Sequence, residues 1–146
     1  MISKKILLFG IVTAIVFSIT ANSQSINAAP IKLDINKAKN PGPGFGEEKI
    51  GTVTIDATGN NTIISTDITA EPGQDKVYEA WLVDEGGSNY KLSLGQADDG
   101  KLQYAANHVN PYTYSQFIIT EEPEADTDPN AGGTFAGADL PPPFGQ

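Results

Sequence analysis

Hydrophobic and polar residues alternate along most of the chain after its first 29 residues. Residues 32–36 and 51–56 each place two apolar side chains on one face of an extended segment and polar ones on the other. Residues 77–83 carry apolar side chains on both faces, which predicts a central strand covered on both sides. The predicted strands are 32–36, 51–56, 62–69, 77–83, 90–94, 101–106 and 117–120, and residues 134–140 can add an eighth.

Turn-forming residues separate these segments. Gly, Asn, Asp and Pro gather at 58–61, 71–73, 85–89 and 98–100, and each of these residue types favours a tight turn. The turns recur at about the 8 to 12 residue spacing of an antiparallel sandwich or barrel. No amphipathic pattern of helical period and useful length follows residue 29, so the sequence predicts an all-β fold with little helix.

Two stretches interrupt the strand pattern. Residues 40–46 alternate Pro and Gly, which cannot form a ladder, so this stretch is predicted to be a loop or linker. Residues 32–36 then form an arm that pairs either with their own sheet or with a neighbour's edge, and internal pairing is the simpler expectation. The second stretch is the acidic, Gly- and Pro-rich segment from residue 121, which ends in a predicted Pro-rich tail over residues 141–146.

The first 29 residues have the pattern of an export signal. Lys4 and Lys5 precede an uncharged, mainly apolar run over residues 6–19, and the small residues Ala21 and Ser23 suit a signal peptidase. An uncleaved membrane anchor is the alternative. Either way the sequence predicts a secreted or cell-surface protein, with a signal peptide over residues 1–29 and one β-domain over residues 30–140.

Composition narrows the possible chemistry. The chain has no cysteine, which excludes disulfides, zinc–thiolate sites and a cysteine nucleophile. Beyond the signal, seven lysines face 18 acidic residues, a formal charge of −11, and arginine is absent. Such a charge disfavours nucleic acids and anionic lipids and favours cations and basic partners, although acidity also serves simply to keep an exposed protein in solution.

Three motifs in the second half of the chain resemble a known family. They are Val77-Tyr-Glu-Ala-Trp-Leu-Val-Asp84, Ser93-Leu-Gly95 and Ile118-Ile-Thr-Glu-Glu-Pro123, and they are followed by a Gly-rich segment. In this order they resemble the extracytoplasmic C-terminal domain of the anti-sigma-K factors, over residues 77–140. The resemblance implies a β-sandwich, so we expect a single antiparallel, immunoglobulin-like β-sandwich of about seven or eight strands.

One candidate metal site occurs in the acidic segment. Asp126, Asp128 and Asn130 have the alternate spacing that opens a calcium loop. The remainder of the pattern does not match, because Ala131 stands where the turn needs Gly and Gly137 where a bidentate acid is needed. We therefore expect a solvated loop with no metal or cofactor, and calcium as the alternative.

No catalytic arrangement is evident. His108 is the only histidine and continues a predicted strand face, so a structural role is expected for it. Trp81, Tyr78, Tyr90 and Tyr104 are more typical of a core than of a sugar or peptide groove.

The sequence therefore favours a non-catalytic, exported β-domain for binding or assembly at the cell surface. Its partner is an unknown protein or a second copy of the chain, with no nucleic acid, and with membrane contact only if the signal stays uncleaved. The alternatives are a regulator of sigma factor activity with a membrane-anchored sensor domain, and a secreted hydrolase. The regulator needs a cytoplasmic domain that the five residues before the apolar run do not supply.

Overall fold

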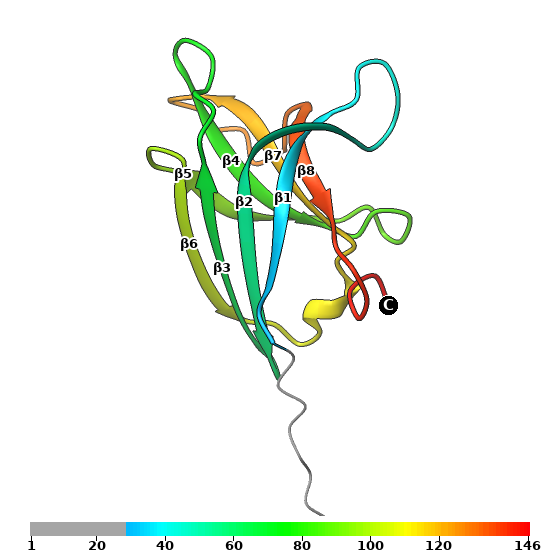
Figure 1. The fold of residues 1–146 in the computed structure, drawn as a ribbon. Coiled ribbons are helices and arrows are strands. Elements are labelled where there is room, and N and C mark those ends of the chain that lie inside the picture. Colours follow the sequence, from blue (N-terminus) through cyan, green and yellow to red (C-terminus); the bar gives the residue numbers. More distant parts are fainter. Residues whose placement is uncertain (1–28) are drawn as a thin grey trace, which may run out of the picture.

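The computed structural model describes residues 29–146, and the predicted signal peptide lies outside these residues except for its last one (Figure 1). Nearly all regular structure in the described part is β-strand. The elements are β1 (Ile31–Ala38), β2 (Phe45–Thr58), β3 (Asn61–Ile68), β4 (Lys76–Val83), β5 (Lys91–Ala97), β6 (Lys101–Asn107), the short 3₁₀ helix η1 (Pro111–Thr113), β7 (Gln116–Pro123) and β8 (Thr134–Asp139). All seven predicted strands and the possible eighth are present, each within a few residues of its expected bounds except β2, which starts earlier.

The eight strands form one antiparallel sheet in the order β5-β4-β7-β8-β1-β2-β3-β6. The sheet curls on itself, so its two halves face each other across a common core (Figure 1). Its two edges, β5 and β6, are joined by the tight turn at Asp98–Lys101. The predicted all-β antiparallel fold is confirmed.

The core lies inside the curled sheet and contains side chains from most strands. Ile35 of β1, Tyr78 of β4 and Phe117 of β7 are at most 2 % exposed and belong to it. On the opposite face of β4 and β7, a smaller cluster of Trp81, Val83 and Ile118 is also buried. The prediction that residues 77–83 are covered on both faces is therefore confirmed.

Burial also changes the acidity of Tyr78 in this core. Removal from water, followed by the nearby charges of Glu121 and Glu71, raises the pKa of Tyr78 to about 12. The hydroxyl stays protonated and donates to the carbonyl oxygen of Glu71 at 3.0 Å. The polar end of this large side chain is therefore satisfied while its ring fills the core.

The predicted arm is an interior strand. β1 pairs with β2 along most of its length, and the Pro-Gly segment forms the loop between them, closed by a bond from the Lys39 nitrogen to the Gly44 oxygen at 3.0 Å. On its other side β1 meets β8. The expected internal pairing of residues 32–36 is confirmed, and the possible linker at residues 40–46 is a hairpin loop that runs into the start of β2.

The C-terminal segment packs against the domain. After β8, Phe144 is buried and its ring lies 5.2 Å from that of Tyr112, centre to centre. The nitrogen of Gly145 donates to the carbonyl oxygens of Tyr112 and Tyr114. Residues 141–146 thus fold back over one end of the sheet instead of extending from it. Among residues 29–146, no helix has the length and apolar character needed to span a bilayer.

A candidate binding cleft between β1 and β8

β1 and β8 pair over a short distance only. The sole paired positions between them are Asn36 with Gly137 and Lys37 with Ala136, whereas β1 pairs with β2 from Ile31 onward. Residues 31–35 therefore have a neighbouring strand on one side only. At about 3.4 Å per residue, the unpaired edge is about 17 Å long.

Like charges disfavour further pairing of the two strands. Continuing the register of Asn36 and Gly137 by two residues would place Asp34 directly opposite Asp139, both on the exposed outer face. Like charges at directly opposite positions of an antiparallel pair destabilise the pairing. Leu140, the residue after β8, donates its backbone N–H to the Ser115 oxygen at 2.8 Å and so continues the pairing with β7, whereas the pairing with β1 has ended at Gly137.

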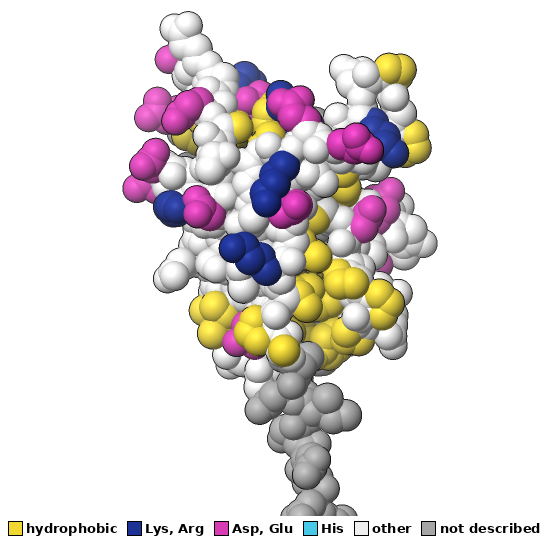
Figure 2. Space-filling model, viewed as in Figure 1, with side chains coloured by type: hydrophobic (Ala, Val, Ile, Leu, Met, Phe, Trp, Pro, Cys, Tyr) yellow, Lys and Arg dark blue, Asp and Glu magenta, His cyan; other side chains and the backbone are white. Residues whose placement is uncertain are grey.

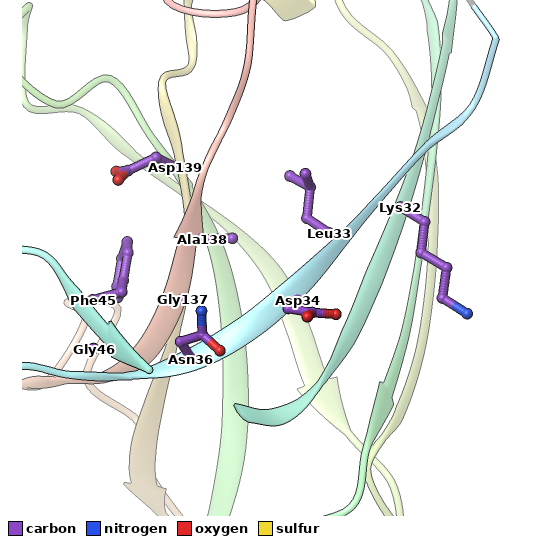
Figure 3. Close-up of a pocket in the computed structure, with 9 residues that line it drawn as sticks. All are labelled: Lys32, Leu33, Asp34, Asn36, Phe45, Gly46, Gly137, Ala138 and Asp139. Atoms are coloured by element: carbon purple, nitrogen blue, oxygen red, sulfur yellow. The ribbon is translucent and has the colours of Figure 1, made fainter. Parts of the chain in front are cut away.

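The separation leaves a cleft of about 490 Å³. Figure 3 shows Leu33 projecting from β1 into the gap, with Ala138 and Asp139 across from it on β8. We refer to this feature as the β1–β8 cleft. Its lining residues are Lys32, Leu33, Asp34, Asn36, Phe45, Gly46, Gly137, Ala138 and Asp139.

The closed end of the cleft depends on a glycine. A Cβ atom on Gly137 would lie 2.6 Å from the ring of Phe45 and 2.4 Å from the carbonyl oxygen of Phe117. Only glycine therefore allows the Phe45 ring to lie over β8 at this point. The ring also packs against the cluster of Trp81, Val83 and Ile118, so it joins the cleft to the outer apolar cluster.

The outer rim of the cleft is polar and mainly acidic. Asp34 is paired with Lys49 at 2.6 Å, and the side-chain amide of Gln116 donates to Asp139 at 2.8 Å. Lys32 points away from the cleft (Figure 3), and its charge contributes to the lowered pKa of Asp67, which a hydrogen bond from Lys101 mainly causes. Among residues 29–146, no cationic side chain is paired with Asp139.

The acidic candidate site is a hydrogen-bonded loop. An Asp126 carboxylate oxygen accepts from the Asp128 nitrogen at 2.8 Å, and one of Asp128 accepts from the nitrogen and the side-chain amide of Asn130 at 3.0 and 2.7 Å. These bonds shape successive turns of the chain. Within the described range, no three or more His, Asp or Glu side chains converge where an ion would bind. That this loop binds no metal stays a prediction, with calcium as the alternative.

His108 lies in an aromatic group. Its ring stacks on Tyr104 at 5.9 Å and meets the edge of Tyr114 at 6.3 Å, and its Nε2 atom lies 3.2 Å from the Tyr104 hydroxyl oxygen. The ring is half-buried. This packing agrees with the structural role expected for His108.

The four aromatic candidates do not line one groove. Trp81 and Tyr78 are buried on opposite faces of β4, and the Trp81 indole N–H donates to the Thr120 hydroxyl at 2.9 Å. Tyr90, by contrast, is 57 % exposed and Tyr104 is half-buried. Trp81 and Tyr78 are core residues, as their strand pattern indicates.

The comparisons with known proteins identify a family. The family described as "Anti-sigma-K factor rskA, C-terminal" matches residues 11–134, so the chain belongs to this family. Its members are regulatory rather than catalytic proteins, which act through protein interactions. No curated protein and no solved structure matches the chain.

Proposed function

We propose that this member of the anti-sigma-K factor rskA C-terminal family is an exported, non-catalytic domain that binds a protein partner at the cell surface. Family membership supports a regulatory, protein-binding role. The basic and apolar pattern before residue 22 supports export. The acidic surface supports a partner that carries positive charge.

The observation that carries the binding role is the β1–β8 cleft. A sheet normally pairs or covers its strands along their whole length, because unpaired backbone groups invite association with another chain. Here residues 31–35 of an interior strand have no strand partner on the side of β8, beside a cleft of about 490 Å³. A partner segment can occupy this position without any rearrangement of the core.

Family membership also favours a second candidate, regulation of sigma factor activity through a membrane-anchored sensor domain. In that case the β-domain is the extracytoplasmic part, and partner binding at the cleft is the signal that it senses. A secreted hydrolase is the remaining alternative, and no group of side chains in the described part of the chain favours it.

Chemical cross-linking on intact cells that express the full chain tests the proposal. We expect surface-restricted cross-linking reagents to capture a discrete partner, and added protease to remove the β-domain from intact cells. Deletion of residues 24–39, which removes β1, provides an unfolded control that should capture nothing specific. Cytoplasmic protection of the domain, or turnover of a peptide, ester or glycan that is lost in His108→Ala, contradicts the proposal.

A further inference from the structure

We propose that the β1–β8 cleft accepts one extended polypeptide segment of alternating apolar and basic residues, which adds as a strand along β1. This inference rests on the proposed protein-binding function and names the chemistry of the partner. The segment lies antiparallel to β1, in the place that β8 leaves. Three properties of the cleft lead to this choice.

The first property is the backbone. Pairing with β2 holds residues 31–35 in the extended β conformation, so their free edge already has the backbone geometry that an added strand requires. About half of their N–H and C=O groups point toward the missing neighbour. A strand added there satisfies them without ordering any part of the domain, which is the physical basis of strand addition in peptide recognition.

The second property is the apolar floor. Leu33 lies between Ile31 and Ile35 on the inward face of β1, and Ala138 lies across the gap on β8. Figure 2 shows hydrophobic side chains gathered at the lower right, where Figure 1 places η1 and the C-terminal segment, with a narrower strip that extends up toward β1 and β8. Apolar side chains on the inward face of an added strand would cover this floor and remove it from water.

The third property is the charge of the rim. Asp34 and Asp139 flank the outer side of the gap. Of the two carboxylates, Asp34 is ion-paired with Lys49, whereas Asp139 accepts a hydrogen bond from the neutral amide of Gln116. An added residue opposite Asp34 points outward, into the space between the two carboxylates. A lysine or arginine there relieves the repulsion that separates the strands, whereas an acidic residue adds to it. The cleft therefore selects a basic residue between two apolar ones.

Three synthetic probes test this inference with the full chain, by fluorescence anisotropy of labelled peptides. The first peptide has the core Thr-Val-Lys-Val-Thr, the second replaces Lys by Glu, and the third keeps Lys but carries N-methyl groups on Lys and on the second Thr. These are the two residues whose N–H groups face β1 when Lys lies opposite Asp34. We expect the Lys peptide to bind about five-fold more tightly than the Glu peptide, which corresponds to about 1 kcal/mol, because Lys forms a partly exposed ion pair where Glu is repelled. The N-methylated peptide should not bind, since it lacks the backbone donors of a strand.

A pair of variants locates the selectivity. Asp139→Asn keeps the side chain's shape and should reduce the preference for Lys over Glu to about two-fold or less. Asp126→Asn removes the same charge from the distant acidic loop and should leave the preference unchanged. Circular dichroism melts verify that both variants are folded. The preference is the ratio of the Kd values for the Glu and Lys peptides, so a change that affects both affinities equally leaves it unchanged.

Amide hydrogen exchange gives the position of the bound peptide. The Lys peptide should slow exchange at some of residues 31–35 and leave the Asp126–Asn130 turns unchanged. Equal binding of the Lys and Glu peptides, or protection elsewhere, overturns the inference. If a cellular partner is captured but Asp139→Asn and added Lys peptide leave that capture unchanged, the cleft assignment is wrong and the protein-binding function stands.

Discussion

Two junctions between neighbouring strands differ in how far the strands pair: the one between β4 and β7, which we call the closed seam, and the one between β1 and β8, the open seam. β4 and β7 pair at eight consecutive positions, from Lys76 with Pro123 to Val83 with Gln116. β1 and β8 pair at two positions and then separate. Both seams face the same core on the inside, but their outer faces carry different side chains.

Outside the closed seam, apolar and polar groups are covered. The cluster of Trp81, Val83 and Ile118 packs against Phe45 and Ala131. Glu122 is only 4 % exposed and accepts a hydrogen bond from the Gly132 nitrogen at 2.7 Å, which holds the loop before β8 against β7. Outside the open seam, Asp34 and Asp139 are exposed carboxylates in opposing positions. The strands are thus paired along their full length where the outer face is covered, and over two positions where it carries opposing carboxylates.

The largest effect should come from removing β1. Deleting residues 24–39 eliminates the strand between β2 and β8 and the buried Ile35, so we expect the domain to lose its cooperative melt, because total stability is only about 5–15 kcal/mol. Deleting residues 24–29 alone is the matched control and should leave the melt unchanged. A folded protein that has lost self-association would instead show that the arm pairs between chains.

The closed seam is tested by Trp81→Ala. Trp81 is 3 % exposed, and its loss removes aromatic packing and the bond to Thr120, so we expect the free energy of unfolding to fall by about 3–5 kcal/mol. Urea unfolding measures it. The matched control is Tyr90→Ala, at a side chain that is 57 % exposed, and it should change stability by less than about 1 kcal/mol. A similarly small effect of Trp81→Ala contradicts its role in the seam.

The junction between the seams is tested by Gly137→Ala. The new methyl group meets the Phe117 carbonyl oxygen and the Phe45 ring, and we expect a loss of about 1–3 kcal/mol because backbone cannot move aside cheaply. Gly133→Ala places a methyl group where nothing lies within 4 Å and is the control. Equal urea midpoints for the two variants would falsify the close packing of Phe45 on β8.

The open seam should tighten in Asp139→Asn. This change removes the like charge opposite Asp34 and retains an oxygen for the Gln116 amide, so we expect a gain of about 0.2–1 kcal/mol. Amide exchange at residues 31–35 should slow in the absence of any peptide. If exchange there is unchanged, the separation of the strands has a cause other than charge.

The smallest effect concerns the loop that covers the closed seam. We expect millimolar calcium not to shift the melting temperature, because Asp126 and Asp128 already use oxygens in the turns of the loop. Asp128→Ala in the presence and absence of calcium completes the measurement. A shift that this substitution abolishes would establish the calcium site.

The strands could be predicted from the sequence because their signals are local. The two-sided run at residues 77–83 and the turns at residues 58–61 and 98–100 each depend on side chains within a few residues. The same signals place Trp81 in a core and give the all-β class. β2 extends further back than its pattern suggests, because Phe45 finds its apolar neighbours in β4 and β7.

The candidate site could not be predicted in the same way. Asp34 and Asp139 are about a hundred residues apart in sequence, and each alone is an ordinary exposed acid on a strand. Only the strand order, which places β8 beside β1, brings them to opposite sides of one gap. The alternation of Leu33 with two charged neighbours was visible, but nothing in it indicates that the next strand is missing.

The incomplete β1–β8 seam also has a mechanical consequence. Tension applied to the chain ahead of Ile31 reaches the domain through β1, whose N-terminal half is held by bonds to β2 alone. A strand that filled the cleft would double the number of bonds that share this load. Occupancy of the cleft would therefore set how much force the domain withstands before β1 detaches, and would couple partner binding to mechanical resistance at the point where the chain enters the fold.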